Sequence, residues 1–470
     1  MARLVIPETF HSQVHGHLLQ DEAEHLAFFL CSASSAGDEA VFLAREVILV
    51  PDSDLEGDLQ YGLSLKLEGL LAVVNQAVKK KLVLVEAHSH PFSEFPRFSG
   101  YDMEGFEEIV PYMLDSMPRS PYAATVWGRS GITGLSWTAW PREGSTLSIS
   151  IVGKQGVRWP SISADLARGD KRHDRQVRML GKAATATIRK LKIAVVGLSG
   201  LGSHAVQQLA HLGARRFVLI DPQAVDETNL NRLVGARPAD VGRPKVEVMA
   251  DLIKGVSTSA EVLPIAADLR TRAALDALKD TDLVFGCIDN DGARLVLNEL
   301  CLAYRIPFID CGVEATVEDG ALQEAGGRVN FILPEGPCLH CMGQLDLNEA
   351  RVALSSEEER RQAKKLGYIK GDDEPSPAVI SLNGAVVSIA ITELLMLLSG
   401  VRRPAPFLVY DALGTGRGRD AQWLTPQRQG QDAACLECTL SGTGDGVDLG
   451  RYELRARRES DDQQGGRVRA

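Results

Sequence analysis

The 470-residue chain has no uninterrupted apolar run of the eighteen or so residues that a membrane-spanning helix needs. Its first residues, MARLVIPETFHSQ, lack the long apolar core and the cleavage site of a signal peptide. Both absences favour a cytoplasmic protein that does not enter a membrane. The chain also lacks an excess of positive charge: 62 acidic residues outnumber 51 basic ones, and the formal net charge of −11 argues against a general nucleic-acid binder. No internal repeat is visible.

The composition is that of an ordinary soluble globular protein, with 44% hydrophobic and 24% charged residues. A chain of this length is too long for one hydrophobic core, so we expect two or three domains. Of the eight cysteines, four form two Cys-x-x-Cys pairs. In a reducing compartment this pattern indicates a metal site rather than disulfides.

Two domains of different type are predicted along the chain. In residues 1–155, short β-rich runs surround one long helical pattern at 61–81, which indicates a small α+β domain. The runs are 40–50, 82–86, 122–127 and 146–152. Residues 156–172 look like a connector, and from 173 to 445 strands alternate with helices, which predicts an α/β domain with a mostly parallel, doubly wound sheet. The polar residues 446–470 are expected to be disordered.

The stretch VEAHSHPFSEFPRFSGYD, residues 85–102, contains a candidate metal site. His88 and His90 are two residues apart after a predicted buried strand, so their side chains share one face. With Asp102 from the following helix they provide three ligands, which leaves a tetrahedral zinc ion one open position for water. Such a site is hydrolytic. Taken alone, the histidine pair has the simpler interpretation of two surface side chains.

The order His-Ser-His-Pro followed by Ser-x-x-Asp resembles the JAMM (MPN+) metalloproteases, which cleave ubiquitin-like proteins from their conjugates. The resemblance implies that Glu24, in EHLAFFLC, is the general base and that Ser99 helps to stabilise the oxyanion. Glu22 is the second choice of base, and Glu86 is disfavoured because it belongs to the neighbouring strand. Eight residues separate His90 from Ser99, one more than the family usually has, so this loop must bulge.

A second motif, VVGLSGLGS, follows a predicted strand and opens a helix, where backbone amides can hold phosphates. Its glycines are Gly197, Gly200 and Gly202, and Ser199 stands where a dinucleotide fingerprint needs its second glycine. This departure disfavours a nicotinamide-dependent oxidoreductase. Asp221, at the end of the next strand, is placed to accept hydrogen bonds from ribose hydroxyls.

The segments IDPQAVDETNLNRLVGARPADVGRPKVE and CIDNDGAR resemble the adenylating domains of ubiquitin-activating enzymes and their bacterial relatives ThiF and MoeB, over about residues 172–440. The resemblance implies that Asn229, Arg232 and Lys245 contact ATP and that Asp289 holds magnesium. It also implies, from RHDRQVR, that Arg175 reaches ATP across a homodimer interface. In this reaction a carboxylate attacks the α-phosphate and displaces pyrophosphate. Cationic side chains and a metal ion suit it because they spread the negative charge of the displacement.

The two Cys-x-x-Cys pairs together predict a closed structural zinc site with four thiolates. Its ligands are Cys338, Cys341, Cys435 and Cys438. His340, inside the first pair, is expected to be a spacer rather than a ligand. The remaining cysteines of this domain, Cys287, Cys301 and Cys311, are expected in its core.

Many relatives carry a cysteine between the two zinc-binding pairs, where it attacks the acyl-adenylate. Here the segment between Cys341 and Cys435 contains no cysteine, and Asp373 aligns at about that position. We therefore expect the adenylate to pass directly to an external thiol, without a covalent enzyme intermediate. In the alternative, Cys311 or Cys287 substitutes.

The resemblances together imply a fusion of a JAMM isopeptidase with a ThiF/MoeB-like activating domain. Its expected cofactors are a catalytic zinc, a structural zinc, ATP and magnesium. Its expected partners are a ubiquitin-like or sulfur-carrier protein with a C-terminal glycine, and a conjugating enzyme or sulfur donor that accepts the adenylate. Two alternatives stay open: sulfur-carrier activation for cofactor or metabolite sulfuration, and a protease whose nucleotide fold only binds the modifier.

Overall fold

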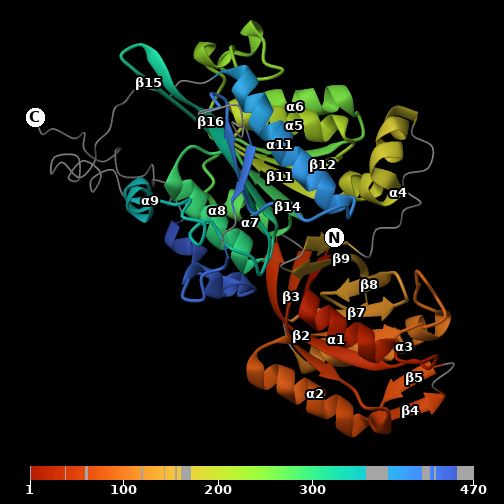
Figure 1. The fold of residues 1–470 in the computed structure, drawn as a ribbon. Helices are drawn as coiled ribbons and strands as arrows, with labels where there is room; N and C mark the ends of the chain where they lie inside the picture. The colour runs from red at the N-terminus through yellow and green to blue at the C-terminus, as the bar shows by residue number, and fades with distance from the viewer. Residues whose placement is uncertain are drawn as a thin grey trace, which may run out of the picture.

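The computed structural model describes residues 2–36, 39–58, 62–117, 120–141, 143–153, 156–159, 171–355, 379–414, 424–427 and 430–452. The predictions made for Asp373 and for residues 453–470 lie outside these described residues. The described part of the chain forms two domains that are in contact with each other (Figure 1).

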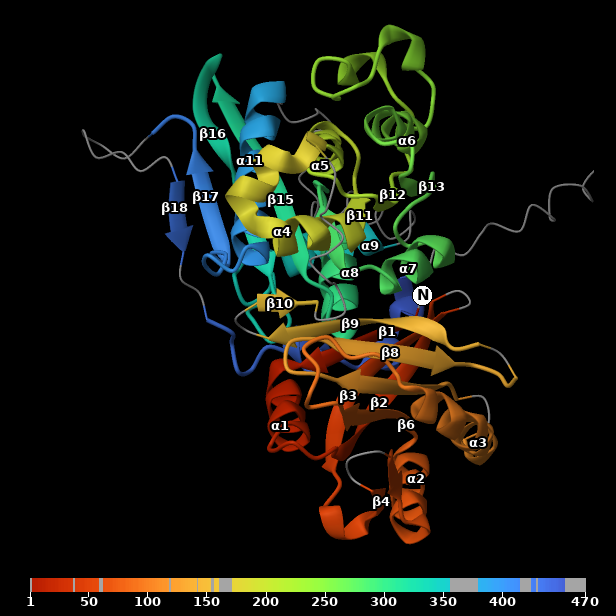
Figure 2. The ribbon, with the colours of Figure 1, turned by 90° about the vertical axis from the view of Figure 1, so that its right-hand side faces the viewer.

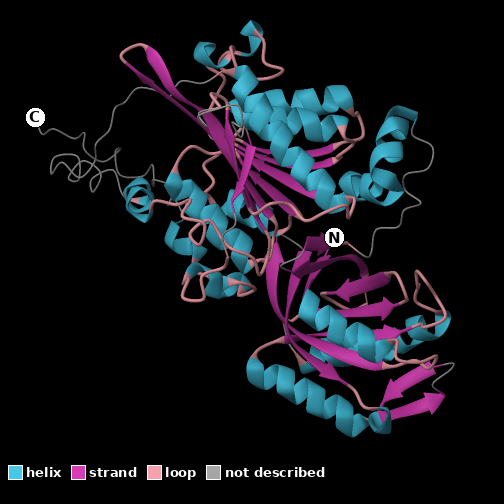
Figure 3. Ribbon diagram, viewed as in Figure 1, coloured by secondary structure: helices cyan, strands magenta, loops and turns pink. Residues whose placement is uncertain are grey.

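The first domain is built on one sheet whose order is β1-β3-β2-β6-β7-β8-β9-β10, and β1 also pairs with β9, which closes the sheet on itself. Figure 3 shows its helices against this sheet. The elements are β1 (Ala2–Pro7), α1 (Glu8–Leu18), β2 (Leu26–Ala36), β3 (Glu39–Leu49), η1 (Asp52–Asp54), β4 (Leu55–Asp58), β5 (Gly62–Leu65), α2 (Leu67–Lys80), β6 (Val83–Ser89), α3 (Gly100–Ser116), β7 (Tyr122–Trp127), β8 (Ile132–Trp137), β9 (Ser145–Gly153) and β10 (Gly156–Arg158).

The α+β content agrees with the sequence prediction, but two boundaries were wrong. The helix expected over 61–81 begins only at Leu67, because Gly62–Leu65 forms β5 and pairs with β4 in a separate hairpin. Residues 156–158, assigned to a connector, form β10 and extend the first sheet beside β9. Val157 and Trp159 are buried there, which explains why this short segment is held in place.

The second domain contains the sheet β13-β12-β11-β14-β15-β16-β17-β18, parallel from β13 to β15 and antiparallel from there on. Figure 1 shows α5, α6 and α11 on one side of this sheet and α7 and α8 on the other. The elements are η3 (Lys171–His173), α4 (Asp174–Lys190), β11 (Lys192–Val196), α5 (Gly200–His211), β12 (Arg216–Ile220), η4 (Glu227–Asn229), η5 (Pro238–Asp240), α6 (Lys245–Val256), β13 (Glu261–Ile265), α7 (Arg272–Lys279), β14 (Leu283–Gly286), α8 (Asp291–Ala303), β15 (Phe308–Glu318), β16 (Ala321–Ile332), α9 (Leu347–Leu354), α11 (Ile380–Leu398), β17 (Phe407–Asp411), β18 (Leu424–Gln427), η6 (Glu437–Leu440), η7 (Gly444–Gly446) and η8 (Leu449–Tyr452).

Helix α11 is the most apolar helix of the second domain. Among the described residues it is the one helix whose length and composition would allow it to cross a membrane, with a mean hydropathy of 1.8. The search for uninterrupted apolar runs missed it because Asn383, Ser388 and Glu393 interrupt the pattern. In the structure α11 packs against α5, β15 and β16, so it is a core helix of this domain and its apolar side chains face these elements.

Strand β1 is buried along its whole length because its two faces serve different cores. Leu4 and Ile6 lie in the core inside the first sheet. Val5 points the other way and joins Val41 and Leu43 of β3 in the large core of the second domain. Figure 2 shows β1 and β9 at this boundary, below α7 and α8. The two domains therefore share a hydrophobic core, which we call the seam.

Three arginine side chains strengthen the seam by donating hydrogen bonds to backbone carbonyls of the other domain. These bonds run from Arg3 Nη1 to Lys279 O at 3.4 Å, from Arg45 Nη1 to Gly442 O at 2.5 Å and from Arg305 Nη1 to Ala44 O at 2.8 Å. A carbonyl acceptor satisfies a guanidinium N–H that would otherwise be buried without a partner.

The segment after the last cysteine pair belongs to the fold, contrary to the prediction that disorder begins at residue 446. Val447 and Leu449 are buried in the core of the second domain, and Arg451 Nη2 contacts Glu299 Oε2 at 2.6 Å. The prediction failed because it was made from the average polarity of the stretch, whereas two apolar residues are enough to anchor its first part. Residues 453–470 lie outside the described chain.

We predict that Leu43→Ala and Leu4→Ala differ in how far their effects spread. Each removes a fully buried leucine at a cost of about 2–5 kcal/mol. Leu43 lies in the seam, so its truncation should speed hydrogen exchange in β3 and also in β14 of the second domain. Leu4→Ala, the control, should speed exchange in the first domain only. Equal patterns for the two variants would contradict a shared core.

Candidate functional site

His88, His90 and Asp102 converge at one end of β6. His88 lies in β6, His90 follows the strand, and Asp102 lies in the first turn of α3. His88 Nε2 is 3.4 Å from Asp102 Oδ1, and His90 Nε2 is 3.5 Å from Asp102 Oδ2. The structure thus brings together the three ligands that the motif predicted.

These residues fit a zinc ion. Tetrahedral zinc with Zn–N and Zn–O bonds of about 2.0–2.1 Å needs neighbouring ligand atoms about 3.3 Å apart, close to the observed distances. His88 Nε2 is also buried without a hydrogen-bond partner among the described residues, and a metal would satisfy it.

The position of Asp102 follows from the way α3 begins. Ser99 caps the helix: its hydroxyl accepts a hydrogen bond from Asp102 N at 3.1 Å, and Ser99 N donates to Asp102 Oδ2 at 2.6 Å. Burial disfavours the ionised form of Asp102, but its contacts with the His88 and His90 rings outweigh burial and lower the pKa of this carboxyl well below its usual range. Asp102 is therefore an ionised carboxylate when a metal arrives.

The other nitrogen of His88 faces Glu86, which the sequence analysis had only set aside as a base. Glu86 Oε1 lies 3.4 Å from His88 Nδ1, and Tyr122 Oη donates to Glu86 Oε2 at 2.6 Å. Burial lowers the pKa of His88, but Asp102 and Glu86 together outweigh burial and raise it to about 9. The signal available in the sequence was the spacing of Glu86 and His88, which share one strand face.

Glu24 lies beside His90. It is buried in the segment just before β2, and its Oε1 is 3.6 Å from His90 Nε2. Burial raises the pKa of Glu24, although the nearby histidines oppose this shift. Glu22 is exposed. Glu24, unlike the second choice Glu22, therefore lies beside the predicted ligands, while the disfavoured Glu86 contacts the other nitrogen of His88.

The long loop between His90 and Ser99 is held against the turn that joins β7 to β8. Arg129 N donates to Ser93 O at 2.9 Å, and Ser130 N donates to Glu94 O at 3.0 Å. A Cβ atom at Gly128 would lie 2.4 Å from Ser93 O, so glycine is required for this close approach. The loop is thus anchored on the β7–β8 turn.

The glycine turn of the second domain lies between β11 and α5. Gly197 has φ +83°, which favours glycine, and a Cβ atom at Gly202 would lie 1.9 Å from Gly197 O. A Cβ atom at Gly200 would lie 2.2 Å from the side-chain nitrogen of Asn383, which comes from α11. The three glycines therefore allow the turn, α5 and α11 to approach closely.

Asp221, at the end of β12, fixes this turn. Its Oδ2 accepts a hydrogen bond from Leu198 N at 2.6 Å, and its Oδ1 accepts one from Gln223 N at 2.8 Å. These oxygens hold the backbone of the glycine turn, and the predicted contact of Asp221 with ribose stays a prediction.

Lys245 brings a buried positive charge to the same turn. Its Nζ lies 2.7 Å from Gln223 Oε1 and 3.4 Å from Ser199 Oγ. Burial lowers the pKa of Lys245, and the charges of Asp221, Arg232 and Asp289 act on it across the site. Positive charge and the N-terminus of α5 thus meet at one place, as phosphate binding requires.

The other predicted nucleotide contacts are distributed around this turn. Asn229 is buried in η4 and its Oδ1 accepts a hydrogen bond from Asp226 N at 3.2 Å. Arg232 Nη1 donates to Thr228 O at 2.7 Å. Arg175 lies in the first turn of α4 and is exposed. The role expected for Arg175, at the nucleotide site of a second subunit, stays a prediction.

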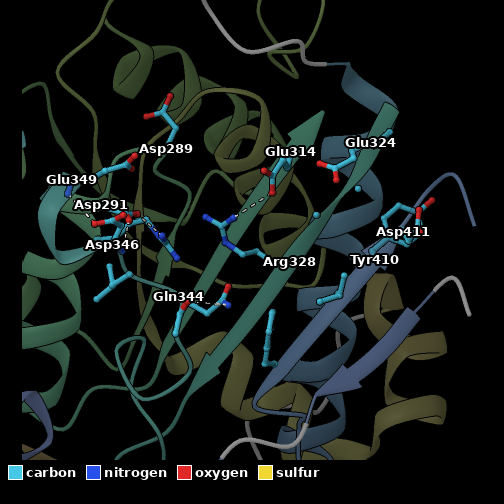
Figure 4. Close-up of a pocket in the computed structure, with 18 of the residues that line it drawn as sticks. Asp289, Asp291, Glu314, Glu324, Arg328, Gln344, Asp346, Glu349, Tyr410 and Asp411 are labelled. Carbon is cyan, nitrogen blue, oxygen red and sulfur yellow. Dashed lines mark hydrogen bonds and ion pairs between the residues drawn. The ribbon is translucent and has the colours of Figure 1, made fainter. Parts of the chain in front are cut away.

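Asp289 lies at the edge of a cleft of about 1020 Å³ over β15, β16 and β17. Figure 4 shows Asp289 and Asp411 at opposite sides of this cleft, with Arg328 between them. Its lining is acidic, since seven carboxylates face two arginines. The carboxylates are Asp289, Asp291, Glu314, Glu324, Asp346, Glu349 and Asp411, and the arginines are Arg294 and Arg328.

The four predicted zinc-binding cysteines form a compact group of free thiols. The Sγ atoms of Cys338 and Cys341 are 3.7 Å apart, those of Cys338 and Cys435 are 3.6 Å apart, and those of Cys341 and Cys438 are 3.5 Å apart. A zinc tetrahedron with Zn–S bonds of about 2.3 Å has edges of about 3.8 Å, so the group fits this metal.

His340 and the three other cysteines of this domain lie near the two sites. His340 Nδ1 contacts Glu437 Oε2 at 2.5 Å and lies 3.8 Å from Cys435 Sγ, and its role as a spacer stays a prediction. Cys287, Cys301 and Cys311 are buried, as expected of core residues. A hydrogen bond with Cys287, together with burial, raises the pKa of the Cys311 thiol well above its usual value. A thiol held in this neutral form is a weak nucleophile.

Residues 173–433 match the model of the ThiF family, and this range is more than half of the chain. The chain belongs to the ThiF family. The ThiF/MoeB likeness of the second domain is therefore confirmed. Since the match begins at residue 173, the JAMM likeness of the first domain stays a prediction.

Two curated relatives show how far this similarity extends. This ThiF-family chain is 29% identical over 184 residues to the SAMP-activating enzyme E1 of Haloferax volcanii, which is 39% of this chain and 64% of that protein. It is 26% identical over 247 residues to the molybdopterin-synthase adenylyltransferase of Escherichia coli, which is 52% of this chain and 88% of that protein. The chain thus spans just under two thirds of the first relative's length.

Among solved structures, the chain is similar to Escherichia coli MccB determined with ATP. The TM-score is 0.44 and the sequence identity 17%, over 58% of this chain and 75% of that one.

We predict that Gly200→Ala destabilises the protein through a clash with Asn383 and that Asn383→Ala, added to it, restores most of the loss. The obstructing atom is the end of a side chain, so truncation removes it. Gly202→Ala is the control: its Cβ meets the backbone oxygen of Gly197, and Asn383→Ala should not rescue it. The melting temperatures of the single and double variants test this. Equal rescue of both glycine variants would contradict the contact.

Proposed function

We propose that the second domain activates a ubiquitin-like or sulfur-carrier protein by adenylating its C-terminal glycine. The observation that carries the proposal is the convergence, in a ThiF-family domain, of the glycine turn, the buried Lys245 and the carboxylate of Asp289. The names of the two relatives support it, because one is a SAMP-activating enzyme and the other an adenylyltransferase.

In this proposal the glycine carboxylate of the modifier attacks the α-phosphorus of ATP, the P–O bond to the β-phosphate breaks, and pyrophosphate leaves. The turn at Gly197 and the N-terminus of α5 offer backbone N–H groups to the phosphates. Lys245 and Arg232 offset the negative charge of the triphosphate. A magnesium ion held by Asp289 would neutralise the leaving pyrophosphate. The acidic cleft beside Asp289 is the path that we assign to the modifier's tail.

We propose that the adenylate passes directly to an external thiol on a conjugating enzyme or sulfur donor. No cysteine occurs between Cys341 and Cys435, and the alternatives Cys287 and Cys311 are buried. The raised pKa of Cys311 further argues against it as the nucleophile. We also propose that Arg175 completes the site of the partner subunit in a homodimer and that the protein acts in the cytoplasm.

We predict that ATP–pyrophosphate exchange occurs only with a modifier that ends in a free glycine, and that Lys245→Met abolishes it. Removing Lys245 leaves the phosphates without their buried cation. Lys254→Met, on the exposed last turn of the same helix, is the matched control and should exchange like the unmodified protein. Asp289→Ala should also be inactive.

This measurement separates activation from simple binding. Modifier binding without pyrophosphate exchange would contradict adenylation and favour a nucleotide fold that only recognises the modifier. Exchange itself is common to protein conjugation and sulfur transfer, so transfer to a conjugating-enzyme thiol or to a sulfur donor distinguishes these two.

We propose a second function for the first domain, a zinc-dependent peptidase that trims or removes the same modifier. The convergence of His88, His90 and Asp102, with Glu24 in contact with His90, supports this proposal. Zinc, when bound, polarises the scissile carbonyl and makes water more acidic. Glu24 Oε1 accepts the proton of the attacking water and delivers it to the departing amine. The Ser99 hydroxyl, beside Asp102, is proposed to donate to the carbonyl oxygen.

We predict two zinc ions per chain, one lost in His88→Ala and the other lost in Cys435→Ser. The two sites have separate ligands, so each substitution should remove one equivalent. Glu24→Gln should retain both ions yet fail to cleave a modifier with a C-terminal extension, because it loses a base and not a ligand. Metal analysis and a cleavage assay test these claims. An unmodified protein with one zinc, unchanged by His88→Ala, would contradict the hydrolytic site.

A further inference from the structure

His25 is a buried histidine that neither proposed function uses. It directly follows Glu24, and its side chain is only 1% exposed. Its ring contacts a carboxylate on each edge: Nε2 lies 3.0 Å from Asp21 Oδ1, and Nδ1 lies 3.0 Å from Asp52 Oδ1. The two aspartates are more than half exposed. The buried His25 ring thus links two surface segments, one that contains Asp21 and one that contains Asp52.

These contacts fix the segment that carries Glu24. Asp21 belongs to the turn before β2, and its Oδ1 also accepts a hydrogen bond from Ala23 N at 2.8 Å. Asp52 belongs to η1, which follows β3. The side-chain nitrogen of Gln20 lies 3.3 Å from each ring nitrogen of His25. The His25 ring therefore connects the turn before β2, through Asp21, to the segment after β3, through Asp52.

The backbone of His25 ties the same point to the metal-ligand strand. His25 N donates to Ser89 Oγ at 2.9 Å, and Ser89 N donates to His25 O at 3.2 Å. Ser89 stands between His88 and His90. The backbone of His25 thus fixes the position of the adjacent Glu24 relative to His88 and His90. The ring of His25 fixes the path of the turn before β2.

From this geometry we propose that His25, clamped by Asp21 and Asp52, is a positioning residue that holds the Glu24 carboxylate beside the metal ligands. The inference rests on the proposed peptidase function. His25 touches no reacting atom, so its effect is exerted through Glu24. A displacement of a catalytic group by about 1 Å can cost about 100-fold in rate.

The test compares His25→Ala with the unmodified protein in three measurements. Zinc content should stay at two equivalents, and hydrogen exchange of residues 20–26 should speed up while α3 and β7 keep their protection. With a peptide whose C-terminal diglycine is joined to aminomethylcoumarin, kcat should fall about 100-fold with little change in KM. Unchanged kcat and exchange would overturn the proposal. Loss of zinc in step with activity would also overturn it, because His25 would then support the ligands.

Matched variants keep the proposal falsifiable if His25→Ala does not fold. Asp21→Asn keeps an acceptor oxygen for Ala23 N and the ring, and should retain most of the kcat, whereas Asp21→Ala should lose it. Asp52→Ala should lower kcat without loss of zinc. Ser53→Ala, exposed beside Asp52 in η1, is the control and should leave kcat unchanged. Equal kcat for Asp21→Asn and Asp21→Ala would overturn the clamp.

If the unmodified protein does not cleave the peptide, the peptidase proposal fails and hydrogen exchange alone decides about His25. Faster exchange of residues 20–26 in His25→Ala, with zinc retained, would then support the clamp, and unchanged exchange would overturn it.

Discussion

The seam between the domains is the constraint on which the rest of the structure depends. In β1 and β3, alternate side chains enter two different cores: Leu4 packs inside the first sheet, while Val5 and Leu43 pack with the second domain. A strand that is apolar on both faces must be covered on both faces. Strand alternation in β1 and β3 therefore places part of the first domain's surface in the core of the second. The two domains that carry the candidate sites therefore share one packed interface.

The candidate metal site and the candidate nucleotide site are both built at the end of a buried strand beside the N-terminus of a helix, but their side chains suit ligands of opposite charge. In the first domain, β6 ends among His88, His90 and the capped Asp102, which suits a cation. In the second, β11 ends at a glycine turn with Lys245 nearby, which suits an anion. In each case a buried strand fixes the first groups, and a helix N-terminus supplies the last: an aspartate oriented by its capping box, or free backbone N–H groups. The cysteine group differs, because both of its pairs lie outside the strands.

Much of this arrangement could be predicted from sequence, because its signals are local. His-Ser-His-Pro with Ser-x-x-Asp located three ligands, and the spacing of EHLAFFLC favoured Glu24 over the exposed Glu22. The features that were missed join residues far apart in the chain. Asn383 occupies the space left by Gly200, and Asp52 meets His25 because β2 and β3 pair in one register. The sequence of β1 also does not reveal that the strand face carrying Val5 packs against the second domain.

The segment that follows Cys438 has a consequence for the order in which the protein is made. Gly442 accepts a hydrogen bond from Arg45, and Val447 and Leu449 fill the second domain's core. On the ribosome the first domain emerges early, but these residues are translated some four hundred positions after Arg45. Until then Leu43, which packs beside Gly444, lacks part of its native cover, and the nascent chain exposes apolar surface of the kind that promotes aggregation.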